Sequence, residues 1–299
     1  MPPARRPPAL HGRVFRRRDA LAAGLLTPSE LRSSAWRRLY RGVYVDANVP
    51  QTVGVRISGA ALLIPASAVF SGRTAAYLHG ATALAEVGDP VEVSVPSGVR
   101  FGPVGGIRVR QVGLSPEDVD IIGQRRCTSA RRTALDIARA DPLAEAVVAS
   151  DVLLARAIVG RSELKEACAQ LVGRGARRAQ QAVALADPRA ESPPESRLRV
   201  LLALAGLAAV PQYNVRDEVG NLLARVDLAF PGCKVAIEYD GAWHAEDGQF
   251  AKDRRRLNRL VAAGWVVLHV TAADLRDPDS LMARVRALVR ERNFGEGAR

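Results

Sequence analysis

Two short alternating segments near the C-terminus constrain the fold more than any other feature of the chain. Residues 222–230 and 234–239 alternate between apolar and polar side chains, and the turn-forming pair Pro231-Gly232 separates them. This pattern predicts two adjacent β-strands. Residues two apart share a face of a strand, so Asp227 and Glu238 come close together when the two strands pair.

The same alternation places Asp240 on the face of Glu238. Three carboxylates that close repel one another, so they need a cation or a shared proton. Their hard oxygens favour Mg²⁺ or Mn²⁺, which can ready a water molecule for attack on a phosphodiester. We therefore expect a metal centre at Asp227, Glu238 and Asp240. Locally, Asp227 could instead pair with Arg225 or Arg254, and Asp240 could simply form a turn.

The order of elements around these strands indicates a domain over 195–292. A short strand at 212–215 precedes the pair, and a helix at 250–263 and an apolar strand at 265–271 follow it, before a final helix at 279–292. A strand hairpin, a crossover helix and a further strand predict a mixed sheet flanked by helices.

Two further residues complete the candidate site. Glu195 lies three residues after Ser192 at the start of a predicted helix. This spacing fits a capping box and also leaves a carboxylate beside the strands. His244 follows the acidic strand and could act as a general base or stabiliser, or be a loop histidine without a role.

The motifs of this domain occur in a fixed order along the chain. They are Arg225-Val226-Asp227, Ile237-Glu238-Tyr239-Asp240-Gly241 with His244, Asp253-Arg254-Arg255-Arg256-Leu257, and Gly264-Trp265-Val266-Val267-Leu268. Together they resemble a widespread bacterial family of unknown function that is grouped with the very-short-patch-repair endonucleases of the PD-(D/E)xK superfamily. The resemblance implies a restriction-endonuclease-like α/β/α fold.

This resemblance also implies roles for single residues. Asp227 and Glu238 would bind the metal, with Glu195 assisting. The superfamily's usual lysine, two residues after the glutamate, is here Asp240. The missing positive charge could come from Lys252, Arg254 or His244, and Arg254 could also contact phosphate.

The first segment, 11–50, predicts a small DNA-binding domain. Residues 18–23 form a short predicted helix that Gly24 ends, and residues 27–30 form a capping box that predicts a second helix starting there. The alternating stretch 36–45 predicts a wing strand. Helix, turn, helix and wing are a DNA-binding layout.

The run from Val14 to Val45 ends in Arg41-Gly42-Val43-Tyr44. It resembles the winged-helix start of the AbiEi antitoxins, a family associated with transcriptional autoregulation and with neutralising a nucleotidyltransferase partner. The resemblance implies two sets of DNA contacts, the major-groove residues Ser29, Arg32, Ser33 and Arg37, and the phosphate contacts Arg38 and Arg41. Alternatively, these arginines are the solvated face of a small helical domain.

The middle segment, 55–187, predicts a mixed α/β module that becomes helical, without a catalytic constellation. It resembles the module that follows the winged helix in AbiEi-like proteins. His79 stands alone and is interpreted as a packed or capping residue. The polar, proline-containing stretch 188–194 predicts a linker to the last domain.

The charge balance favours a polyanionic partner. The chain has 43 Lys+Arg and 31 Asp+Glu, a net charge of +12. Such a surplus attracts nucleic acid through counterion release, although the arginine content of a GC-rich genome gives the same numbers. The start is not a secretory signal, no apolar stretch is long enough to span a bilayer, and the three cysteines form no metal or disulfide pattern. We therefore expect a cytoplasmic protein with no membrane partner.

The sequence thus predicts an α+β multidomain protein with two alternative functions. In the first, it is a Mg²⁺- or Mn²⁺-dependent DNA endonuclease guided by an N-terminal DNA-binding module, with RNA as a further substrate that the sequence leaves open. In the second, it is a non-catalytic antitoxin-like regulator whose nuclease-like domain only binds DNA or a partner.

Overall fold

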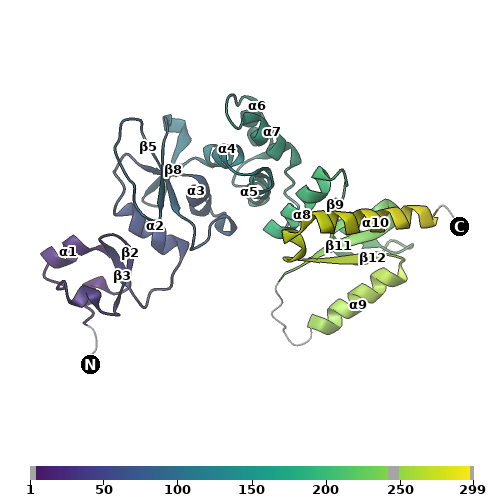
Figure 1. Cartoon of the computed structure of the whole chain (residues 1–299), viewed down its shortest axis with the longest axis horizontal. Helices are drawn as coiled ribbons and strands as arrows, with labels where there is room; N and C mark the ends of the chain where they lie inside the picture. Colours follow the sequence, from purple (N-terminus) through teal and green to yellow (C-terminus); the bar gives the residue numbers. More distant parts are fainter. Residues whose placement is uncertain (1–4, 242–248, 297–299) are drawn as a thin grey trace. The chain divides into compact units, whose positions relative to one another are not determined.

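The computed structural model describes residues 5–241 and 249–296 and divides into two compact units, Met1–Ile137 and Ala138–Arg299. Both units combine helices with β-sheet, which gives a mixed α/β protein of more than one unit (Figure 1). Within the described residues, each helix is too short or too polar to cross a membrane.

The first unit begins with a small antiparallel sheet in the order β1-β3-β2. Its elements are β1 Val14–Arg16, α1 Arg17–Ala22, β2 Trp36–Tyr40 and β3 Val43–Asp46. The rings of Phe15 and Trp36 pack edge to face, with their centroids 5.2 Å apart, and leucines from the helix and loops surround them. Val14–Arg16 therefore forms a strand that pairs with the predicted wing.

The prediction of a second helix starting at residues 27–30 is wrong, because a short 3-10 turn forms there in place of an α-helix. The capping box itself forms, because the Thr27 N–H donates to Glu30 Oε2 at 2.7 Å and the Glu30 N–H donates to Thr27 Oγ1 at 3.3 Å. However, the chain makes only a 3-10 turn over Glu30–Arg32. Two serines follow this turn, and serine competes with the helical backbone for hydrogen bonds. Burial of Trp36 then draws the chain into β2.

A second sheet of the same unit has five strands in the order β6-β5-β4-β8-β7. Its strands are β4 Val69–Phe70, β5 Val91–Val95, β6 Ile107–Gln111, β7 Val119–Ile122 and β8 Arg125–Thr128, and its helices are α2 Val53–Ala61 and α3 Gly72–Leu78. Tyr40 and Ile57 share one buried cluster with Phe70, so the two sheets have a common core. Gly59 allows this contact, since a Cβ there would lie 2.9 Å from the Tyr40 ring.

The start of α3 is built around a buried carboxylate. Glu92 on β5 accepts the Arg73 N–H at 3.0 Å and pairs with Arg108 at 2.6 Å. Gly72 has φ +54°, and a Cβ at this position would lie 1.6 Å from Glu92 Oε2. Only glycine leaves room for the carboxylate at this helix start.

The second unit contains a four-stranded mixed sheet in the order β12-β11-β10-β9. Its strands are β9 Val210–Arg216, β10 Leu222–Phe230, β11 Val235–Asp240 and β12 Val266–Thr271, and the helices nearest to them are α8 Pro193–Leu204, α9 Gln249–Ala262 and α10 Pro278–Glu296. The strands β11 and β12 are parallel, and the other neighbours are antiparallel. The predicted mixed sheet is therefore confirmed.

Helices cover both faces of this sheet (Figure 1). Leu198 of α8 and Leu281 of α10 pack with Leu228 and Ile237 on one face. Leu260 of α9 packs on the other face, in a cluster that includes Ala229 and Ala236.

Three further helices belong to the second unit rather than to a separate middle module. They are α5 Leu143–Ala155, α6 Arg161–Ala169 and α7 Ala176–Leu185, and α4 Ala130–Ala140 runs across the boundary between the units. Arg199 of α8 donates to Asp151 of α5 at 2.7 Å and to the Leu185 carbonyl at 2.6 Å, and Asp151 also accepts the Asp187 N–H. The division thus differs from the expected domain boundaries, because buried contacts join the two sides of the expected linker at 188–194.

Replacing Gly72 tests the packing at the start of α3. We expect Gly72→Ala to lower the free energy of unfolding by about 3 kcal/mol or more, because the new methyl group must displace the buried Glu92 carboxylate as well as strain the backbone. Gly98→Ala is the matched control, since Gly98 also has positive φ but nothing lies within 4 Å of its Cβ position. Its expected cost is about 1 kcal/mol. Equal losses in denaturant unfolding would contradict the role given to Glu92.

Candidate functional site

Two carboxylates of the predicted site lie next to each other on the central strands of the second unit. Leu228 on β10 pairs with Ile237 on β11, so the next position along places Asp227 opposite Glu238. Opposite residues of an antiparallel pair project from the same face. Here that face is the one covered by α9, as the neighbouring pair of alanines shows.

The Asp227 side chain takes the place of a main-chain partner where the ladder ends. The register of β10 and β11 stops at Leu228 and Ile237, and two residues further along β11 the Tyr239 N–H donates to Asp227 Oδ2 at 2.9 Å. This hydrogen bond holds one carboxylate oxygen at the end of the pair of strands.

Glu238 is paired with an arginine from the crossover helix. The guanidinium of Arg256 on α9 donates to Glu238 Oε1, and the Glu238 side chain is only 13% exposed. Arg256 therefore supplies positive charge beside the two carboxylates. Of the groups expected to supply it, Arg254 is exposed on α9, whereas His244 and the side chain of Lys252 lie outside the described residues.

Asp240 has a partner of its own. Its Oδ2 atom lies 3.1 Å from Nδ1 of His269 on the parallel strand β12. The structure thus brings Asp227 and Glu238 together and pairs Asp240 with His269. Across residues 5–241 and the described side chains of the second segment, no three His, Cys, Asp or Glu side chains are grouped to hold a metal ion.

Glu195 forms the helix cap that its spacing predicts. Ser192 Oγ accepts the Glu195 N–H at 3.4 Å, and the Glu195 carboxylate accepts from Ser192 Oγ at 2.7 Å and from the Gln212 amide at 2.9 Å. The bond to Gln212 on β9 holds this carboxylate at the sheet. Glu195 is therefore a capping residue whose charge also acts on Asp227.

The surroundings of Asp227 make its charged form costly. Burial raises the pKa of the Asp227 carboxyl, the Tyr239 N–H opposes this rise, and the negative charge of Glu195 adds to it. The positive charge of Arg256 lowers the pKa in turn. A buried acid beside another acid is a setting in which a bound cation relieves unfavourable charge.

The residues expected to face DNA in the first unit are divided between the surface and the interior. Ser29, Arg32, Arg38 and Arg41 are exposed. Arg37, by contrast, donates to the carbonyls of Ala47 and Val49 at 3.3 and 2.6 Å. Its Nε and the Ser33 hydroxyl are buried without hydrogen-bond partners in the described part of the protein. Arg37 thus stabilises the loop after β3. This role is structural and differs from the expected contact with the major groove of DNA.

His79 has the packed role expected from the sequence. Its Nε2 atom lies 2.8 Å from the Thr128 carbonyl and 3.9 Å from the sulfur of Cys127. Burial raises the pKa of the Cys127 thiol to about 11, so the thiol stays protonated near neutral pH. The thiolate is the nucleophilic form of cysteine, and burial disfavours it here.

Arg256 and His269 are the two site residues that the sequence did not single out. Arg256 stands within a run of three arginines, and periodicity alone does not tell which of them faces the sheet. His269 interrupts the apolar run of β12, and this polar residue in an apolar strand was the available signal. Its register partner on β11 is Glu238.

Comparisons with known proteins identify relatives from one organism. No family profile matches the chain. Two Mycobacterium tuberculosis proteins, the uncharacterized proteins Rv2248 and MT2308, are each 32% identical to it over 268 residues, which cover 86% of this chain and 94% of the relative. The crystal structure of RV2827C protein from Mycobacterium tuberculosis aligns with 68% of this chain and 83% of its own, with 14% identity and a TM-score of 0.39, a likeness too low to support an argument.

The buried charge of Asp227 predicts an unusual pH dependence of stability. A folded-state pKa above the unfolded value means that stability is highest in acid and is lost as the pH rises through the folded pKa. Asp227→Asn keeps an oxygen that can accept the Tyr239 N–H, so we expect its melting temperature to exceed that of the wild type at pH 7. The gain should vanish below about pH 4, where the aspartate is protonated in both states.

Asp217→Asn is the opposite control for this measurement. A hydrogen bond from the Asn221 side chain lowers the pKa of Asp217, with backbone N–H groups of the same turn adding to the effect. Its replacement should therefore reduce stability at pH 7, and the difference should shrink as the pH falls. A lower melting temperature for both variants at pH 7 would contradict the cost assigned to Asp227.

Proposed function

This chain belongs to the same protein family as the Mycobacterium tuberculosis proteins Rv2248 and MT2308, and we propose that its second unit hydrolyses phosphodiester bonds of nucleic acid with a divalent metal ion. The observation that carries the proposal is the pair Asp227 and Glu238, side by side on one face of adjacent strands with Arg256 over them. Such a pair, half-buried and next to a guanidinium, suits chemistry on an anionic substrate.

The donor set fits Mg²⁺ or Mn²⁺. Magnesium in proteins is commonly held by one or two carboxylates, with water molecules and substrate phosphates as the other ligands. Asp227 and Glu238 would hold the ion, and the raised pKa of Asp227 indicates a carboxylate that gains from a nearby cation. When bound, the ion would polarise the phosphate and make a water molecule more acidic.

In this proposal, Arg256 takes the part of the lysine that is usual in the PD-(D/E)xK superfamily. It neutralises Glu238 in the structure, and its guanidinium has further N–H donors in a planar fork. Such donors match phosphate oxygens and stabilise the negative charge that develops during hydrolysis. We propose that Arg256 turns toward the scissile phosphate when nucleic acid is bound.

Asp240 orients His269 in this proposal. Because the Nδ1 atom of His269 faces the Asp240 carboxylate, Nε2 is the ring nitrogen left to accept or donate a proton. The residue at the position of the expected lysine therefore contributes through a histidine on the neighbouring strand.

A non-catalytic nucleic-acid-binding regulator is the second candidate. Glu238 and Asp240 both have protein partners, Arg256 and His269, so these two carboxylates are satisfied without an added ion. This pairing favours a domain that binds without cutting. Cleavage assays separate the two candidates directly.

We expect Mg²⁺ or Mn²⁺ to support nicking of supercoiled plasmid by the full-length protein, and EDTA to abolish it. Asp227→Asn and Glu238→Gln should each slow cleavage by about 10²- to 10³-fold or more, because the ion loses one of two charged ligands. Glu218→Gln removes an exposed carboxylate of the same unit and should leave the rate unchanged. Labelled DNA and RNA strands assayed in parallel identify the substrate. Binding of either without cleavage under any metal would favour the regulator.

Arg256→Gln separates phosphate stabilisation from metal binding. We expect cleavage to fall by about 10²-fold, while Mn²⁺ binding measured by calorimetry stays equal or becomes tighter, because Glu238 loses a competing cation. Arg255→Gln is the matched control, since Arg255 is an exposed neighbour on the same helix. Cleavage at the wild-type rate by Arg256→Gln would remove Arg256 from the proposed site.

A further inference from the structure

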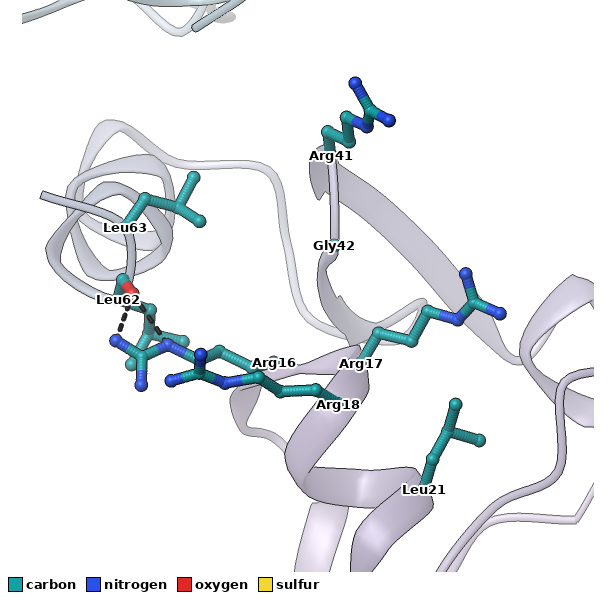
Figure 2. Close-up of a pocket in the computed structure, with 8 residues that line it drawn as sticks. All are labelled: Arg16, Arg17, Arg18, Leu21, Arg41, Gly42, Leu62 and Leu63. Atoms are coloured by element: carbon teal, nitrogen blue, oxygen red, sulfur yellow. Dashed lines mark hydrogen bonds between the residues drawn. The ribbon is translucent and has the colours of Figure 1, made fainter. Parts of the chain in front are cut away.

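A pocket on the first unit is lined almost entirely by arginines and leucines. Its volume is about 500 Å³, within the range of small-ligand sites. The lining residues are Arg16, Arg17, Arg18, Leu21, Arg41, Gly42, Leu62 and Leu63 (Figure 2). Among these described residues none is acidic, and the ten arginines of the first 50 residues outnumber three acidic residues.

Backbone pairing brings these arginines together from two places in the sequence. Arg16 at the end of β1 pairs with Val43 on β3. The Arg17 N–H then donates to the Gly42 carbonyl at 2.8 Å, which fixes the start of α1 against the tight β2–β3 turn. Gly42 provides the positive φ of +78° that this turn requires. Arg17 and Arg41 therefore flank the same opening.

The arginines of the pocket differ in whether other groups of the protein already bind their guanidinium groups. Arg16 donates through Nε to the Leu62 carbonyl at 2.7 Å, at the end of α2, and so is fixed in the wall. Arg18 pairs with Asp19 at 3.2 Å, an exposed contact of small strength. Arg17 and Arg41 extend outward from the helix and the turn (Figure 2), and neither has a carboxylate partner within the described part of the chain.

The leucines give the pocket an apolar surface beside this charge. Leu21 comes from α1, and Leu62 and Leu63 follow α2, and all three are half-buried. A ligand that suits the pocket combines anionic groups for two guanidiniums with a less polar part for the leucines. Nucleotides have this combination, since phosphates alternate with sugars and bases along a strand.

We propose that this pocket binds the phosphodiester backbone of a nucleic acid, with phosphates at Arg17 and Arg41. The proposal rests on the proposed function for the class of ligand, and it adds the surface of the first unit that contacts it. It keeps Arg41 from the expected phosphate contacts, adds Arg17, and places the contact at the junction of α1 with the β2–β3 turn, whereas Arg37 on β2 is bound within the fold.

The salt dependence of binding tests this assignment. The full-length protein is titrated against a labelled duplex oligonucleotide and a labelled single strand, in EDTA, over a series of NaCl concentrations. Each phosphate contact contributes about 0.9 to the slope of log K against log salt for duplex DNA. We expect Arg17→Gln/Arg41→Gln to lower that slope by about 1 to 2 and to weaken binding at least tenfold at about 0.15 M salt.

A second double variant controls for charge alone. Arg100→Gln/Arg110→Gln removes the same charge from exposed positions of the same unit. Its slope should change by less than half as much, and both variants should keep the wild-type melting temperature. An equal effect of the two variants, or an unchanged slope in Arg17→Gln/Arg41→Gln, would overturn the assignment. Release of the oligonucleotide by an equal concentration of mononucleotide or inorganic phosphate would also overturn it, since the site would then prefer a small anion.

The outcome is separable from that of the proposed function. If the wild type binds in EDTA with the expected dependence on Arg17 and Arg41 but does not cut with metal, the pocket stands and the hydrolase fails. If the wild type cuts and Arg17→Gln/Arg41→Gln binds and cuts equally well, the pocket fails and the hydrolase stands.

Discussion

The hydrogen bond between the Tyr239 amide and the Asp227 carboxylate is the contact on which the candidate site depends. The register between β10 and β11 ends at Leu228 and Ile237, and this side chain joins the two strands just beyond that pair. The bond keeps Asp227 pinned beside Glu238 although burial disfavours its charge. Hydrogen bonding to backbone donors is the usual means of holding a carboxylate in such a place. The surrounding groups, Arg256 above all, then offset the charge that this arrangement concentrates.

Some arginines of this protein bind groups of the fold, and others project from the surface. Arg16, Arg37 and Arg199 each donate to backbone carbonyls within the fold. Their guanidinium groups donate hydrogen bonds to backbone carbonyls that helix ends and loops leave without a partner in regular secondary structure. Arg17 and Arg41 instead project from the surface. The net charge of the chain therefore overstates the charge that a polyanion meets, and the place of each guanidinium matters more than the number.

Strand alternation was the most dependable signal in the sequence, and its limits are physical. The predicted span of 222–230 matches β10, because a two-residue period is strictly tied to the faces of a sheet. The capping box at Thr27 was also real, but a cap marks where a helix starts and contains no information on its length. The partners of Glu238 and Asp240 come from α9 and β12, and contacts over such separations depend on tertiary packing. Arg37 shows the same limit, since its buried role follows from the path of the loop after β3.

The ion pair between Asp151 and Arg199 has a consequence for how the chain can be divided. Both side chains are nearly inaccessible, and the loss of one partner from such a pair leaves a bare charge in the interior, which costs about 3–5 kcal/mol. Scission anywhere in residues 188–194 would separate the two charges onto different pieces. The mixed sheet and the helices α5, α6 and α7 should therefore be expressed together, since a fragment cut between them would leave one of these charges buried without its partner.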